Sequence, residues 1–149
     1  MQDLWPEKIE YPVIDAPVAI LMRQAVALGK KTGNVVEGRV EQTRTHPDRF
    51  GYSFSIVGPL LGDYSYRLFT IAHGVELYPV EIGAEPAIMV EIARKTESQP
   101  REKDHRGAAI AETQDEFENI LRAIFAASKT QNVVGAIIKQ SQAFSQEAV

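Results

Sequence analysis

The sequence predicts an α+β domain: an N-terminal helix, an antiparallel meander of four to five strands, and two C-terminal helices packed on one face of the sheet. Three observations predict this fold. Hydrophobic residues recur at helical spacing in residues 16–31, they alternate at period two between residues 35 and 82, and helical spacing returns from residue 113. Strands grouped together with helices at either end are typical of an antiparallel sheet covered on one face.

The first helix is predicted over residues 16–31. Asp15 offers an N-cap, a proline in the first turn is tolerated, and Gly33 stands where a C-terminal cap is wanted. One face of this helix carries the apolar residues Val18, Leu21, Met22, Ala25 and Leu28. We expect this stripe to pack on the sheet.

The segment before this helix is predicted to be extended and laid across the body of the protein. It carries Trp5, Tyr11 and the prolines Pro6 and Pro12, and Pro17 follows it. Each proline fixes its own φ and pushes the preceding residue away from the helical region. An extended path is therefore expected.

Four strands are predicted over residues 35–45, 50–57, 64–72 and 76–82, and a fifth over residues 87–93. Turn signals connect the first three, with Pro47 at the second position of a type I turn and Gly62 and Asp63 at the tightest point of the next. Proline cannot donate a hydrogen bond to its neighbour strand, so Pro79 places the fourth strand at an edge or a bulge.

Two helices are predicted after a charged segment. A mobile loop is expected over residues 95–112, because its first twelve residues carry seven charged side chains and no large apolar group. Thr113 and Glu116 then form a capping box, followed by apolar residues at helical spacing. A shorter helix begins at Ser128 and ends just before residues 143–149, which are expected to fray.

The composition is that of one globular domain over residues 1–149. Hydrophobic residues make up 44% of the chain and charged residues 24%, which is an average globular composition. A net charge of -4 gives no global basic field, which argues against a nucleic-acid partner. Glutamates interleaved with the arginines of the predicted sheet argue the same way.

The chain contains no cysteine, which excludes disulfide bonds, a thiolate nucleophile and zinc sites with sulfur ligands. The N-terminus lacks the basic and apolar regions of a secretory signal. The nearly apolar run that starts at Pro17 is too short to span a bilayer. These observations predict a cytoplasmic protein with no membrane partner.

The sequence holds no recognised catalytic or metal-binding motif, so no catalytic residue, metal ligand or cofactor is predicted. Phosphate-binding glycine loops, the G-x-S-x-G elbow and H-E-x-x-H do not occur. His46, His73 and His105 stand far apart, each in a predicted turn or loop, and their membership of a site stays open. The sequence leans against an enzyme.

Aromatic residues are concentrated in the predicted sheet, where seven of the chain's twelve lie between residues 50 and 78. A tyrosine carries a polar tip, which suits a boundary between protein and water or between two proteins. We predict that a partner binds at Tyr52, Tyr64, Tyr66 and Arg67.

Strict alternation along the third strand assigns its residues to faces. Tyr64 and Tyr66 are expected to share one face with Leu68, while Arg67 shares the other face with Phe69. Three helices cannot fully cover both faces, so an exposed aromatic patch is expected.

The leading hypothesis is a small cytoplasmic interaction protein, an adaptor or regulatory module that binds another protein or forms a homodimer. Its contact is expected on the exposed sheet face or on the edge strand near Pro79. The missing catalytic motifs, the tyrosine-rich sheet and the apolar C-terminal helix pair motivate it.

Two other functions stay open. One is a carrier or sensor of a small apolar ligand, held between the sheet and the first helix by Leu21, Met22, Phe54 and Tyr66. The other is a hydrolase with a site assembled from His73, Asp63 and Arg67.

Overall fold

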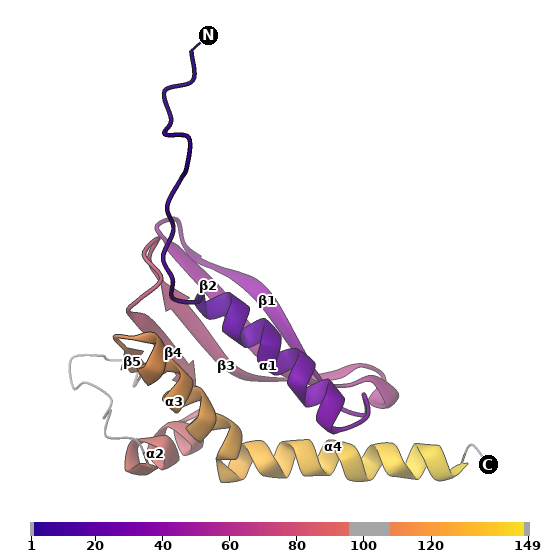
Figure 1. Ribbon diagram of the computed structural model, residues 1–149. Helices are drawn as coiled ribbons and strands as arrows, with labels where there is room; N and C mark the ends of the chain where they lie inside the picture. The colour runs from indigo at the N-terminus through magenta and orange to yellow at the C-terminus, as the bar shows by residue number, and fades with distance from the viewer. Residues whose placement is uncertain (1, 96–107, 148–149) are drawn as a thin grey trace.

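A computed structural model describes residues 2–95 and 108–147 of the chain (Figure 1). In chain order, its elements are α1 (Pro17–Lys31), β1 (Glu37–His46), β2 (Arg49–Gly58), the short 3₁₀ helix η1 (Pro59–Leu61), β3 (Tyr64–His73), β4 (Val80–Ala84), α2 (Pro86–Lys95), β5 (Ala109–Ala111), α3 (Gln114–Ala126) and α4 (Ser128–Glu147).

The five strands form one sheet in the order β1-β2-β3-β4-β5, and every neighbouring pair is antiparallel. The predicted α+β class, the N-terminal helix, the antiparallel meander and the two C-terminal helices are confirmed. The edges of the sheet are β1 and the three-residue β5.

The fifth strand is not where the alternation placed it. Residues 87–93 lie in helix α2, whose buried residues Ile88, Met89 and Ile92 follow helical spacing. An apolar run this short does not distinguish a strand from a buried helix. Strand β5 instead pairs with Val80–Ile82 from within the predicted loop, of which residues 96–107 lie outside the described residues.

Pro79 does not mark an edge strand. It stands just before β4, and β4 lies between β3 and β5 inside the sheet. Because Pro79 stands ahead of the first residue of β4, its missing N–H removes no hydrogen bond between the strands, and β4 can lie inside the sheet. The predicted edge near Pro79 is therefore wrong.

Helices α1 and α3 lie side by side on one face of the sheet (Figure 1). The rings of Phe54 and Phe69 stack with centroids 5.3 Å apart, and Phe125 of α3 packs against both. Helix α1 approaches β1 at Gly38, where a β-carbon would stand 2.6 Å from the Cα of Ala25. We call this side the covered face of the sheet.

A β-bulge changes the faces of β3. Phe69 pairs with Phe54, but Arg67 pairs with the next residue, Ser55, so that Leu68 has no partner in the register. Residues directly opposite each other point to the same face. Phe69 and Arg67 therefore lie on different faces, and the predicted grouping of Arg67 with Phe69 is wrong.

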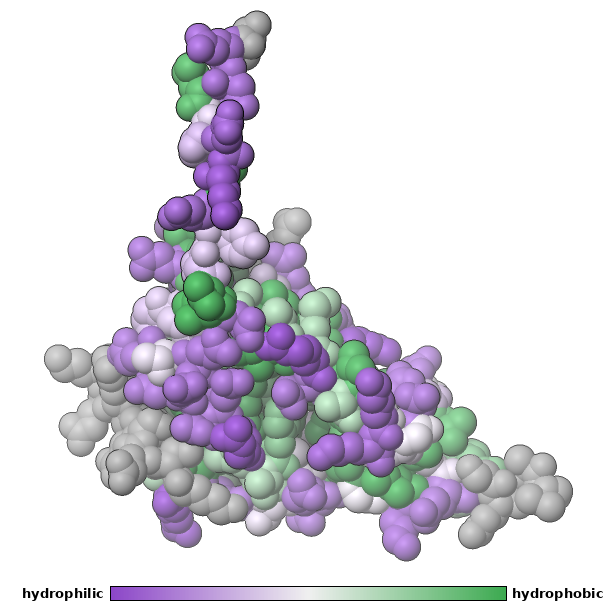
Figure 2. Space-filling view, in the orientation of Figure 1, coloured by the Kyte–Doolittle hydropathy of each residue, from purple (hydrophilic) through white to green (hydrophobic). Residues whose placement is uncertain are grey.

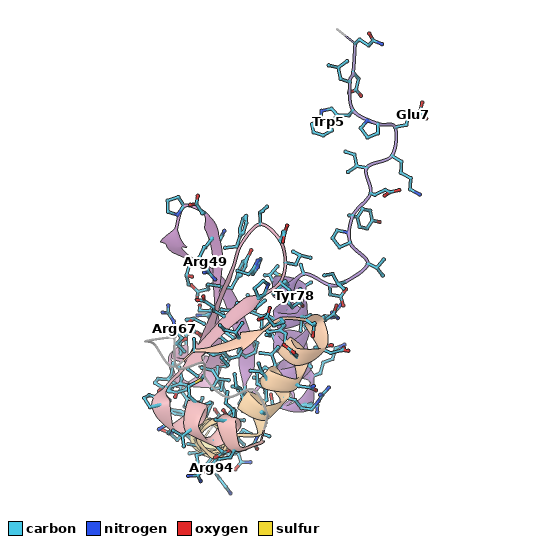
Figure 3. All side chains as sticks on the ribbon, turned by 90° about the vertical axis from the view of Figure 1, so that its left-hand side faces the viewer. Trp5, Glu7, Arg49, Arg67, Tyr78 and Arg94 are labelled. Carbon is cyan, nitrogen blue, oxygen red and sulfur yellow. The ribbon has the colours of Figure 1, made fainter. Side chains whose placement is uncertain are left out.

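The same bulge determines on which face the two tyrosines of β3 lie. Tyr66 pairs with Ile56 and Tyr64 with Gly58, both on the covered face. The predicted grouping of these tyrosines with Leu68 assumed an uninterrupted period-two alternation along β3, and the bulge interrupts it. Arg67 and Arg49 lie on the side of the sheet away from α1, which we call the open face (Figure 3).

The C-terminal helices begin as predicted. The Thr113 hydroxyl accepts a hydrogen bond from the Glu116 N–H at 3.2 Å, which caps α3. Helix α4 begins at Ser128 and runs to Glu147, so it includes most of the segment expected to fray.

The N-terminal segment is extended, as its prolines indicated, but it does not lie across the body. Residues 2–14, which we call the arm, project away from the sheet and helices (Figure 1). The expectation of a strap over the body is wrong, since no described element covers these residues.

Candidate functional site

The base of the arm is fixed to the body at Asp15. Its N–H donates to Gln114 Oε1 at 2.8 Å, and its carbonyl accepts from the Tyr78 hydroxyl at 3.2 Å. The Asp15 carboxylate also accepts from Arg23 at 2.8 Å, and this hydrogen bond and charge hold the pKa of Asp15 below its usual value. The arm therefore leaves from a defined position.

Beyond this base, large apolar side chains stand in solvent. Five residues of the arm are each at least 64% exposed, namely Leu4, Trp5, Ile9, Tyr11 and Val13. Figure 2 shows hydrophobic residues among hydrophilic ones along the arm, clear of the body. Single exposed apolar residues are ordinary, but five large ones on one projecting segment exceed ordinary surface exposure.

The outer flank of α1 is a second exposed apolar surface. Met22 and Val26 are 57% and 58% exposed, and with Arg23, Ala27 and Lys30 they line a shallow depression of about 410 Å³. Leu21 and Ala25 lie toward the sheet instead, since Leu21 is fully buried and Ala25 lies against Gly38. Met22 was predicted as part of the packed stripe, yet it lies at its outer margin.

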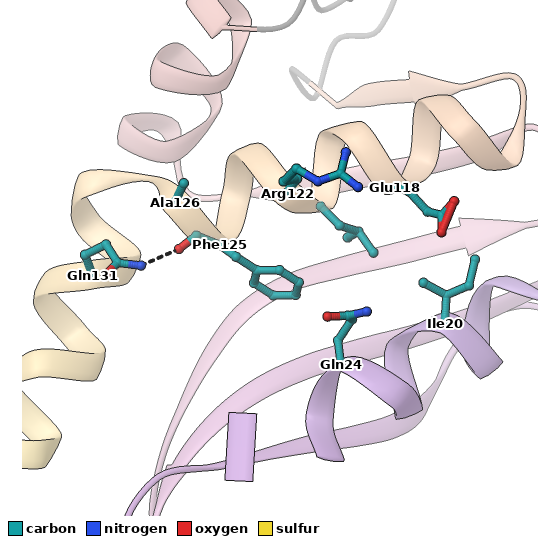
Figure 4. A pocket seen from close by; sticks show the side chains of 8 residues that line it. Ile20, Gln24, Glu118, Arg122, Phe125, Ala126 and Gln131 are labelled. Atoms are coloured by element: carbon teal, nitrogen blue, oxygen red, sulfur yellow. Dashed lines mark hydrogen bonds between the residues drawn. The ribbon is translucent and has the colours of Figure 1, made fainter. Parts of the chain in front are cut away.

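A groove lies between α1 and α3 (Figure 4). It has a volume of about 340 Å³ and an apolar floor that includes Ile20, Leu121 and Phe125. Polar side chains form its rim, and among them Gln131 donates to the Phe125 carbonyl at 2.7 Å. Figure 2 shows hydrophobic residues down the middle of the body, between α3 and α1.

The structure does not bring the four predicted partner-binding residues onto one surface. Tyr52 is half-buried on the covered face, with its ring 6.2 Å from that of His73. Tyr64 is 49% exposed near the end of that face, while Arg67 is exposed on the open face. Neither face carries an aromatic patch made of these residues.

Tyr66, the fourth, is bound within the body. Its hydroxyl donates to Glu85 Oε2 at 2.9 Å. Burial raises the pKa of Tyr66 to about 12, and the Glu85 carboxylate adds to the rise because it disfavours a phenolate beside it. Tyr66 fixes the start of α2 to β3.

The residues of the hydrolase alternative are also apart. Asp63 precedes β3 and His73 ends it, so the whole strand separates them. His73 is buried against Phe50, and its Nδ1 lies 2.7 Å from the Gly74 carbonyl oxygen. Arg67 lies between them on the open face. His105 is outside the described residues, as is the side chain of His46.

The cavity predicted for a small ligand is not formed by its four residues. Leu21 and Phe54 are buried in the core, and Met22 points to the outer flank of α1. Tyr66 is bound to Glu85 instead. The groove that does exist lies on the other flank of α1, toward α3.

Residues 2–95 and 108–147 contain no metal-binding cluster and no membrane-spanning helix. Within these ranges no three His, Asp or Glu side chains gather as metal ligands. In the same part of the chain, every helix is too short or too polar to cross a bilayer.

Sequence reasoning missed the exposure of the arm. Its signal was present in the alternation of apolar and polar residues from Lys8 to Val13, outside any predicted helix or strand pairing. Comparisons of the chain with protein-family models, with curated proteins and with solved structures return no match.

Proposed function

We propose that this protein is a small cytoplasmic protein–protein interaction module, adaptor or regulatory, whose contact element is the arm of residues 2–14. One observation carries the proposal: five large apolar side chains stand exposed on a segment that projects from an otherwise packed domain. Removal of this apolar surface from water by a partner would contribute favourable free energy to binding.

Burial of the apolar side chains of the arm would contribute several kcal/mol of favourable free energy to binding. Full burial of one large apolar side chain contributes roughly 1.5–3 kcal/mol. Trp5 and Tyr11 are also the residue types that most often dominate binding energy at interfaces. Pro6 and Pro12 restrict the free arm, so less conformational entropy is lost when it becomes ordered.

The attachment of the arm supports the same function. Asp15 is held by Gln114, Tyr78 and Arg23, so the domain presents the arm from a fixed point. Figure 3 shows Trp5 and Glu7 carried outward, with Tyr78 near the base. A rigid base limits the orientations that a bound partner must select.

Photo-cross-linking tests the proposal. A photoreactive phenylalanine analogue replaces Trp5, and in a matched protein it replaces Tyr64, the exposed tyrosine of the predicted sheet patch. In lysate of the source organism, or with the purified chain alone, we expect a defined protein adduct from position 5 only. An adduct from position 64 alone moves the contact to the sheet, and no adduct from either position removes the interaction function.

A second candidate function rests on the groove between α1 and α3. Its volume of about 340 Å³ and apolar floor suit a small apolar ligand with one polar group. Thermal unfolding with medium-chain fatty acids and aromatic acids tests it, because a ligand of the folded state raises Tm. The rise is expected to disappear in Gln24→Trp, which fills the groove, and no rise with any compound removes this candidate.

A further inference from the structure

Strand β1 offers a free edge for pairing. It is ten residues long and, in the part of the chain that the structure describes, pairs only with β2. Alternate N–H and C=O groups of an edge strand point outward without a partner strand. The opposite edge, β5, has only three residues. The long free edge is therefore β1.

The arm has the pattern of a strand that would pair there. Ile9, Tyr11 and Val13 alternate with Lys8, Glu10 and Pro12. At period two, the three apolar side chains share one face and the other three share the opposite face. The arm contains no helix that would have to unfold, and residues 9–12 lie between bends at residues 7–8 and 13–14.

The two prolines of the arm fit the same strand. Pro6 and Pro12 are both even-numbered, so in a regular strand their nitrogens point to the same side. If that side faces solvent, the N–H groups of the odd residues, such as Glu7 and Tyr11, face the partner strand. Proline occurs in sheets mainly on edge strands with this orientation.

Helix α1 supplies an apolar surface next to this edge. It lies over β1, with Ala25 against Gly38. Ile20 and Gln24 line the groove toward α3. Met22 comes two residues after Ile20, and Val26 two residues after Gln24. Two residues correspond to a rotation of about 200° around the helix, so Met22 and Val26 lie on the flank away from α3. An added strand with apolar residues toward α1 would cover them.

The charges of the two surfaces are complementary. Helix α1 carries Arg23, Lys30 and Lys31 and no acidic residue. Residues 2–14 carry three acidic side chains and one basic side chain. This difference favours encounter between the arm and α1.

From these observations we propose that two copies of this chain form a dimer by exchanging arms, each arm adding as a strand to the β1 edge of the other copy. The inference rests on the proposed function and names its partner as a second copy. The arm spans about 40 Å when extended, longer than β1 at about 33 Å per ten residues. Exchange of both arms gives a closed two-fold dimer.

The arm does not readily reach β1 of its own chain. It leaves Asp15 pointing away from its own sheet (Figure 1). To return along β1 it would have to turn further than the bend that already exists at Val13 and Ile14, and β-branched residues are poor in tight turns. A second copy removes the need for that turn.

Light scattering after size-exclusion chromatography of the full chain tests the dimer. We expect a dimer, and a monomer in the variant Tyr11→Ser with Val13→Ser, since it loses the apolar face of the added strand. Val75→Ser with Phe144→Ser removes exposed apolar area outside the arm and retains the dimer. A full chain that is monomeric up to about 100 µM, or a dimer unaffected by the first variant, overturns the proposal.

A matched pair of proline variants tests the hydrogen bonding. Glu7→Pro and Glu10→Pro remove the same charge. Only residue 7, which is odd-numbered, is expected to direct its backbone N–H toward β1. Both arms of the dimer carry the change, so two hydrogen bonds are lost and Glu7→Pro raises the dimer dissociation constant about thirtyfold. Glu10→Pro is expected to have a smaller effect, and equal effects overturn the proposed pairing.

Introduced cysteines locate the contact, because the natural chain has none. Protein with Glu10→Cys is mixed with protein of different mass that carries Glu41→Cys on β1, and oxidised. A mixed disulfide dimer is expected. Asn119→Cys on α3 replaces Glu41→Cys in the control. Equal yields from the two mixtures overturn the placement at β1.

The outcomes separate this inference from the proposed function. A monomeric chain whose position 5 cross-links to a different protein overturns the arm exchange and leaves the interaction function standing. A monomeric chain with no adduct overturns both. Circular dichroism of each variant verifies that the body is still folded.

Discussion

The covered and open faces of the sheet are equally buried along β2, but for different reasons. Phe54 is 1% exposed because α1 and α3 pack over it, while Ser53 and Ser55 on the open face are 2% and 5% exposed. Ser55 lies between Arg39 and Arg67, whose long side chains flank it. Low exposure alone therefore does not identify the hydrophobic core.

The largest expected difference is between adjacent residues of β3. Phe69 faces the core beside Phe54, and Thr70 faces the open side opposite Ser53. Phe69→Ala removes a buried ring and leaves a cavity, which destabilises the fold by about 3–5 kcal/mol. Thr70→Ala is expected to cost less than about 1 kcal/mol. Urea unfolding followed by circular dichroism measures both.

A similar cost for the two variants would contradict the assignment of faces. Where Phe69→Ala does not fold, Phe69→Leu retains part of the packing and costs less than about 2 kcal/mol. It is then compared with Thr70→Ala in the same way.

Two glycines, one on each face of the sheet, test the same difference between the faces with a smaller expected change in stability. A β-carbon at Gly38, under α1, would stand 2.6 Å and 2.8 Å from Ala25 atoms, whereas at Gly83, on the open face, the nearest atom is 3.8 Å away. Gly38→Ala must push α1 away and is expected to cost about 1–3 kcal/mol. Gly83→Ala is expected to be near neutral or slightly stabilising.

Thermal unfolding of the two glycine variants, matched in chemistry, measures this difference. A Gly38→Ala protein as stable as the parent would show that α1 does not rest on β1 at this point. A strongly destabilised Gly83→Ala protein would show that the open face is covered.

Much of the fold follows from periodicity and capping. Helix α3 was predicted because Thr113 caps it and its apolar residues keep helical spacing over several turns. Helix α2 was missed because its apolar run is short and two of the elements it packs against, α3 and α4, are distant in the sequence. The bulge at Leu68 was missed because leucine carries no sign of irregular pairing.

The candidate site followed less well from the sequence. Tyr52, Tyr64 and Tyr66 were grouped by composition, but the register sends their side chains to the covered face, where Tyr66 binds Glu85. The extended form of the arm could be predicted from Pro6 and Pro12. Its direction could not, because that depends on how Asp15 contacts residues far away in the chain.

The smallest expected effect concerns pH and tests where the bulge puts Tyr66. Folding raises the pKa of this tyrosine from 10.0 to about 12, mainly by burial and also through Glu85. Between those values the folded state holds a proton that the unfolded state has released, so stability is full below pH 10 and falls as pH rises toward about 12. Tyr78 shows a shift of the same size and contributes in the same window.

Tyr66→Phe should therefore lose less stability than the parent between pH 8 and pH 11, although at pH 8 it is less stable by about 1 kcal/mol for the lost hydrogen bond to Glu85. Tyr66→Phe with Tyr78→Phe should lose less again. Urea unfolding at both pH values measures the difference. An identical alkaline loss in parent and variants would mean that neither hydroxyl is buried as described. Tyr66 would then lie on the open face, where a regular strand without the bulge at Leu68 would place it opposite Val57.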